Sequence, residues 1–190
     1  MEMRHKTYKI IGIFALIALL CVLFVAYREN TQPFLQMPDS IDNFEAINID
    51  GGKTTFQAEK GKATLIVLSA SWCPACIAEL PTLTKLHGEF AQDGLRVLMV
   101  SEDDNVKIAS RFKKKYAMPW TMVHWNYDLM NKLGNPRVIP VSYLLDSDGK
   151  IDYIEAGIIE EARMRRAIKA LVKYPRYSIQ LLPRFGVQRE

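Results

Sequence analysis

Two cysteines, Cys73 and Cys76, stand where a predicted strand gives way to a predicted helix. The run 63–68 before them is apolar and rich in β-branched residues. After them, apolar residues recur at helical spacing from Ile77 to Phe90. Two residues between cysteines in a first helical turn bring the sulfur atoms close enough to bond. A Cys-x-x-Cys motif in this setting is typical of a redox-active dithiol.

The two cysteines have different expected roles. Cys73 would lie at the helix N-terminus, where unpaired N–H groups and the helix dipole favour the thiolate, which is the attacking species. Pro74 suits the first helical position, because the N–H that it lacks would have no partner there. Cys76, one turn further along and shielded, would resolve a mixed disulfide by attacking Cys73. We therefore predict thiol–disulfide exchange.

A zinc site and an inert structural disulfide are the alternative interpretations of this motif. A structural zinc ion needs about four ligands. Cys21 lies far upstream in an apolar run, and His87 and His124 have no ligand-like spacing. The redox pair is favoured on ligand count and placement.

The N-terminus has the features of a membrane anchor. Residues 10–26 form an uncharged, almost wholly apolar run, near the lower length limit for crossing a bilayer. Basic residues precede this run, which places the N-terminus in the cytoplasm. No small-x-small cleavage site follows, so we expect an uncleaved anchor over residues 1–29 rather than a cleaved signal peptide. The rest of the chain would lie in the periplasm or a similar extracytoplasmic space, where disulfides persist.

The remaining chain divides into a linker over residues 30–42, one domain over 43–174 and a basic tail over 175–190. The net charge of +4 is concentrated towards the two ends, so we predict no nucleic-acid surface on the domain. Pro81 is expected to kink or break the helix after the cysteines. We predict an α/β domain with a mixed central sheet and helices on both faces. The expected strands are 44–49, 54–56, 63–68, 95–100, 121–125, 138–145 and 150–156, and the expected helices are 73–90, 105–116, 127–133 and 160–173.

The run Trp72-Cys73-Pro74-Ala75-Cys76, followed by Glu79 and Pro81, resembles the W-C-x-x-C-x-x-E-x-P signature of TlpA/ResA-type proteins. The resemblance covers about residues 43–173. It implies a thioredoxin-like fold and a membrane-tethered thiol–disulfide oxidoreductase of the periplasm or cell surface. Trp72, Pro74 and Ala75 would then border the active site.

The resemblance adds two positions. The family has a cis-proline that faces the disulfide, ahead of a strand that ends in an Asp-x-x-Gly-Lys turn. Ile139-Pro140, followed by the matching turn at 146–150, occupies this place. The family also has a partly buried glutamate that handles protons for the second cysteine, which corresponds to Glu79. Taken alone, Pro140 would be expected trans and Glu79 could equally be an exposed helix residue.

Departures from the family pattern bear on function. Ser69 replaces a frequent aromatic residue, which implies a more open rim above the disulfide. Ile139 resembles the residue of ordinary thioredoxin, which suggests a reductant. The Gly-Val-x-Gly-Ala-Pro-Glu run of haem-maturation specialists is absent, so a dedicated role in cytochrome c biogenesis is less expected.

We therefore expect a disulfide reductase that acts on protein disulfides and draws electrons from a transmembrane reductase of the DsbD/CcdA kind. No metal or other cofactor would be needed beyond the Cys73–Cys76 pair. An oxidase or isomerase on the same fold is the first alternative, because potential and not motif sets the direction of electron flow. A tethered Cu(I) or haem chaperone is the alternative from another class. Measuring the metal content of the purified protein would distinguish such a chaperone from a redox enzyme.

Overall fold

The computed structural model describes residues 15–24 and 38–173 of the chain. It divides into two units, residues 1–36 and 37–190, which are described separately. In the first unit, residues 15–24 form a helix with exposed side chains. Among the described residues, no helix is long and apolar enough to span a membrane. The ends of the predicted anchor segment 10–26 and the whole predicted tail 175–190 lie outside the described residues.

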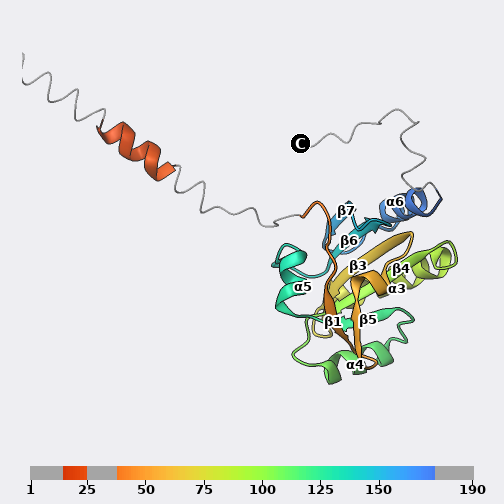
Figure 1. Ribbon diagram of the computed structural model, residues 1–190. Helices are drawn as coiled ribbons and strands as arrows, with labels where there is room; N and C mark the ends of the chain where they lie inside the picture. Colours follow the sequence, from red (N-terminus) through yellow and green to blue (C-terminus); the bar gives the residue numbers. More distant parts are fainter. Residues whose placement is uncertain (1–14, 25–37, 174–190) are drawn as a thin grey trace, which may run out of the picture. The chain divides into compact units, whose positions relative to one another are not determined.

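The second unit is built on one mixed sheet of seven strands in the order β2-β1-β5-β4-β3-β6-β7 (Figure 1). β3, β4 and β5 are parallel, and the remaining neighbours pair antiparallel. The strands are β1 (Glu45–Asn48), β2 (Lys53–Thr55), β3 (Ala63–Ser69), β4 (Leu95–Ser101), β5 (Thr121–His124), β6 (Val141–Asp146) and β7 (Ile151–Ala156).

Helices cover both faces of this sheet. They are α2 (Phe56–Glu59), α3 (Pro74–Phe90), α4 (Val106–Lys115), α5 (Tyr127–Lys132) and α6 (Glu161–Lys173). Apolar residues of α3, α4 and α6 share one core with Leu65 and Val67 of β3. Those of α2 and α5 share the other core with Ile66 and Leu68. Alternate side chains of a strand point to opposite faces, so β3, buried along its whole length, contributes to both cores.

Two features of the chain place the reactive residues. Parallel strands β3 and β4 end at the same edge of the sheet, and the N-termini of α3 and α4 follow them there. β6 runs antiparallel beside β3, so its first residue, Val141, pairs with Leu68 at that same edge. The loops before α3 and before β6 are thereby brought together.

The predicted α/β class and mixed sheet are confirmed, with two local corrections. The strand predicted to start at residue 138 starts at Val141, because Pro140 has no N–H to give to a ladder. Pro81 lies inside α3 without dividing it. A proline removes one backbone hydrogen bond, and the buried residues Leu80, Leu83 and Leu86 hold the helix against the core on either side.

The end of the predicted linker 30–42 contacts the domain. Ser40 forms a bridge with Lys150, and the Ile41 N–H donates to the Gly149 carbonyl at 2.9 Å. The Ile41 side chain is buried in the core shared with Phe44 and Phe56. The packed domain therefore includes residues before 43, the start predicted from the sequence.

Candidate active site

Cys73 caps the N-terminus of α3, directly after the loop that leaves β3. Its Sγ accepts the Cys76 N–H at 3.2 Å, which satisfies one of the unpaired donors of the first helical turn. Both cysteines are free thiols. Cys73 retains 5% of its surface and Cys76 none, so only the first sulfur can meet a partner without movement.

Burial controls the chemistry of Cys76. The pKa of its thiol is raised to about 12, chiefly by desolvation and in part by the neighbouring Cys73 sulfur, with the Ala70 N–H acting in the opposite direction. A thiol with this pKa stays protonated at neutral pH and is a poor initial nucleophile. The predicted order, in which Cys73 attacks first and Cys76 resolves, agrees with this arrangement.

Ser69 does not lie on the rim above the disulfide, so the expectation of a more open rim is wrong. It is the last residue of β3, 1% exposed, and shares the strand face of Leu65 and Val67 that α3 covers. That face directs it into the interior beneath α3, where its hydroxyl has no hydrogen-bond partner among the described residues. Its place in the strand, and not the family pattern, decides its role.

The loop before β6 faces Cys73. The Ile139–Pro140 peptide bond is cis, as the resemblance implied. The Cys73 thiol donates to the Ile139 carbonyl oxygen, with Sγ and O 3.8 Å apart. Ile139 and Ala75 pack against the cluster of Ala70, Cys73 and Cys76. A backbone edge therefore lies next to the reactive sulfur atom.

The other predicted border residues differ in exposure. Trp72 is 63% exposed immediately before Cys73. Pro74 occupies the first position of α3 and is exposed, whereas Ala75 is half-buried. Trp72 therefore offers a large apolar surface beside a sulfur atom that is itself nearly covered.

Glu79 is completely buried on α3, which excludes the exposed interpretation. Its Oε2 accepts the Ile159 N–H at 3.4 Å, and its Oε1 has no partner among the described residues. Burial raises the pKa of this carboxyl to about 8, with the Ile159 N–H opposing the shift and the charge of Glu155 adding to it. Glu79 stands one helical turn after Cys76, but its recorded hydrogen bond is to Ile159. Proton exchange between Glu79 and Cys76 stays a prediction.

Asp103 is a site residue that the sequence reasoning missed. Its carboxylate is buried and accepts the Ser71 N–H at 3.1 Å, the Ser71 hydroxyl at 2.7 Å and the Ser101 hydroxyl at 2.8 Å. His124 Nε2 lies 2.9 Å from the Asp103 carbonyl oxygen. Asp103 thus anchors the turn that carries Trp72 and Cys73. The sequence signal that could have revealed Asp103 was the polar pair Glu102-Asp103. This pair directly follows a buried strand, at the edge of the sheet where the parallel strands end.

Solved structures share this fold. One is a thiol:disulfide interchange protein, thioredoxin family protein, from Chlorobium tepidum TLS, with a TM-score of 0.64 and 21% identity over 71% of this chain and 97% of that one. Another is StoA from Bacillus subtilis, with a TM-score of 0.57 and 23% identity over 68% of this chain and 98% of that one. They confirm the thioredoxin-like fold.

Curated relatives match this chain over about three quarters of their own length. The chain is 26% identical over 131 residues to thiol-disulfide oxidoreductase ResA of Bacillus cereus, covering 67% of this chain and 72% of that protein. It is 30% identical over 141 residues to thioredoxin-like protein YneN of Bacillus subtilis, covering 70% of this chain and 76% of that protein.

The fold and the dithiol site define a thiol–disulfide oxidoreductase. Residues 37–154 match the AhpC/TSA family. The chain belongs to that family, and its TlpA/ResA-type resemblance is confirmed.

Proposed function

We propose that this protein is a membrane-anchored, extracytoplasmic disulfide reductase that acts on protein disulfides. The observation that carries the proposal is the pairing of a nearly covered Cys73 at a helix N-terminus with a fully buried Cys76. The proposed direction rests on Ile139, which resembles the residue of ordinary thioredoxin at this place and packs against Cys73.

The exchange has two steps. The Cys73 thiolate attacks one sulfur of the substrate disulfide and forms a mixed disulfide with it, while the substrate S–S bond breaks and the other sulfur leaves as a thiolate that takes up a proton from water. Cys76 then gives up its proton and attacks Cys73, which releases the second substrate thiol and forms the Cys73–Cys76 disulfide. The substrate gains two electrons, and the protein loses them.

Neighbouring groups assist the second step. The Ala70 N–H favours the Cys76 thiolate as it forms. Glu79, with a pKa of about 8, is poised to take a proton near neutral pH. The backbone around Ile139 and Pro140 positions the extended substrate segment beside Cys73.

The compartment and the electron donor belong to the same proposal. The apolar run 10–26 supports a membrane anchor, and the order of charges around it supports a catalytic domain outside the cytoplasm. A reductase in an oxidising compartment has to be re-reduced, and a transmembrane protein of the DsbD/CcdA kind would supply the electrons. The dithiol itself serves as the redox group, with no further cofactor.

Cysteine variants of the full-length chain test the proposed exchange with a disulfide-bonded protein such as insulin. Wild-type protein in its reduced form is expected to reduce the substrate. Cys76→Ser should accumulate a mixed disulfide through Cys73, because the resolving thiol is absent. Cys73→Ser should be inert. Reduction by Cys73→Ser at the wild-type rate would contradict the assigned order of attack.

A further inference from the structure

Four cations of α4 form no ion pair among the described residues: Lys107, Arg111, Lys114 and Lys115. Arg111 and Lys115 stand four residues apart on one face of the helix, and both are exposed. Over residues 38–173, neither forms an ion pair, whereas the neighbouring Lys113 pairs with Asp50. Lys115 Nζ lies 5.2 Å from the centre of the Tyr116 ring. These two positive charges are therefore available to a ligand.

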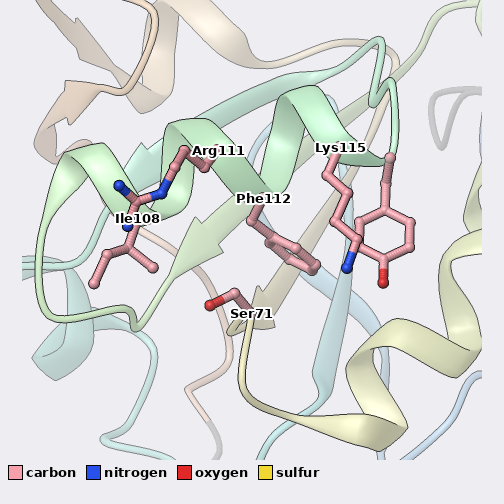
Figure 2. A pocket seen from close by; sticks show the side chains of 6 residues that line it. Ser71, Ile108, Arg111, Phe112 and Lys115 are labelled. Carbon is pink, nitrogen blue, oxygen red and sulfur yellow. The ribbon is translucent and has the colours of Figure 1, made fainter.

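Both cations line a hollow beside the active-site turn. Its volume is about 310 Å³, and its lining residues are Ser71, Ile108, Arg111, Phe112, Lys115 and Tyr116. Figure 2 shows Arg111 and Lys115 on α4 to either side of Phe112, whose ring points toward Ser71. Ser71 precedes Cys73 by two residues, a backbone span of at most about 7 Å. A molecule in this hollow would lie next to the reacting cysteine.

A second, more apolar hollow adjoins the first. It has a volume of about 390 Å³ and is lined by Ile77, Leu80, Pro81, Thr84 and Tyr116. Tyr116 belongs to the lining of both, so the two hollows are neighbours between α3 and the end of α4. We refer to them together as the α3–α4 surface. It offers two positive charges followed by an apolar depression.

We propose that the α3–α4 surface docks the protein's redox partner through a segment that carries an acidic side chain followed by an apolar one. The acidic side chain would pair with Arg111 and Lys115, and the apolar one would fill the depression at Ile77, Leu80 and Pro81. This inference rests on the proposed exchange function, because the partner is the protein whose disulfide or dithiol reacts with Cys73.

Charge complementarity favours a polypeptide partner of this kind. Opposite charges near a reactive site raise the rate of encounter and fix the orientation of the partner. The two cations that line the first hollow and the apolar hollow beside it match one acidic and one apolar side chain of a polypeptide. The docked segment would hold the partner's sulfur atoms near the Cys73 thiol.

The experiment measures thiol–disulfide exchange between the full-length chain and three synthetic peptides. Each peptide has one intramolecular disulfide and carries Glu-Leu, Gln-Leu or Glu-Ser beside a cysteine. Rates are measured in both directions, so the result does not depend on the direction used in the cell. The double variant Arg111→Glu/Lys115→Glu is compared with Lys107→Glu/Lys114→Glu, which makes the same charge change elsewhere on α4.

At low ionic strength, wild-type protein is expected to react about tenfold faster with the Glu-Leu peptide than with the Gln-Leu peptide. The Glu-Ser peptide should react about threefold more slowly than Glu-Leu, because it leaves the apolar hollow empty. Arg111→Glu/Lys115→Glu should lose the preference for glutamate and keep its rate with Gln-Leu, while Lys107→Glu/Lys114→Glu should retain the preference.

Equal rates with all three peptides, or a preference that survives in Arg111→Glu/Lys115→Glu, would overturn the docking inference and leave the exchange function standing. Failure to exchange with any peptide in either direction would instead overturn the proposed function, and the docking inference with it.

Discussion

Glu79 and Cys76 show how burial changes the acid–base behaviour of single residues in this protein. Both side chains are fully buried on α3, one turn apart. Desolvation raises the pKa of each, so near neutral pH Cys76 keeps its proton, whereas Glu79, with a pKa of about 8, is ionised in part and can accept one in that form. The resolving thiol therefore needs a nearby base at the moment that it attacks, and Glu79 is the candidate.

Replacing Glu79 with glutamine tests this role. Glu79→Gln keeps the shape of the side chain and removes its ability to take a proton. We expect the resolving step to slow by about 100-fold, the lower end of typical general-base effects. The measurement is the rate of substrate thiol release by stopped-flow kinetics. Glu89→Gln, at an exposed site on the same helix, serves as the control, and equal rates for all three proteins would refute the role.

The raised pKa of Glu79 also predicts how stability depends on pH. Between the ordinary value of 4.5 and the folded value of about 8, the folded chain holds a proton that the unfolded chain has lost. The contribution of Glu79 is therefore present in full below about pH 4.5 and is lost as the pH rises through 8. The loss should be on the order of a few kcal/mol. Urea unfolding at a series of pH values should show this slope in wild-type protein and not in Glu79→Gln.

At the residue scale, sequence reasoning succeeded where local spacing determines the chemistry. The spacing of Cys73 and Cys76 predicted the capping position and the order of exposure. The burial of Glu79 depends on the loop around Ile159, eighty residues away, so its local sequence could not reveal it. The anchoring role of Asp103 likewise depends on the adjacency of two loops.

At the element scale, close packing at the start of β3 complements the active site at its end. Gly61 lies before β3, and the Gly94 carbonyl oxygen accepts the Lys62 N–H at 3.0 Å. A Cβ atom on Gly61 would meet that carbonyl oxygen well inside contact distance. The largely apolar sequences of β3 and β4 made both strands easy to predict, whereas this contact between their ends needed the three-dimensional structure.

Gly61→Ala should therefore destabilise the domain. The added methyl group forces the starts of β3 and β4 apart, and we expect the free energy of unfolding to fall by about 1–3 kcal/mol. Gly88→Ala is the matched control, because nothing lies within 4 Å of a Cβ atom at that site within α3. It should stabilise the helix by about 0.5–1 kcal/mol. Equal denaturation midpoints for the two variants would contradict this account of the strand ends.

At the scale of the whole molecule, the topology brings distant segments into one site. Cys73 and Ile139 are 66 residues apart in sequence, and they meet because β6 runs antiparallel beside β3. No local pattern predicts this pairing, so the cis-proline position came from the family resemblance alone. The direction of electron flow is also a property of the whole site, since it depends on the relative stability of the dithiol and the disulfide.

The reduction potential of the Cys73–Cys76 pair tests the proposed reductase most directly. It is measured on the full-length chain by equilibration with glutathione or dithiothreitol buffers. We predict a value near or below about −270 mV, the range of thioredoxin, because Ile139, which packs against Cys73, resembles the residue that ordinary thioredoxin has at this place. A value near about −120 mV, the range of DsbA, would contradict the account, since such a protein donates its disulfide to other proteins.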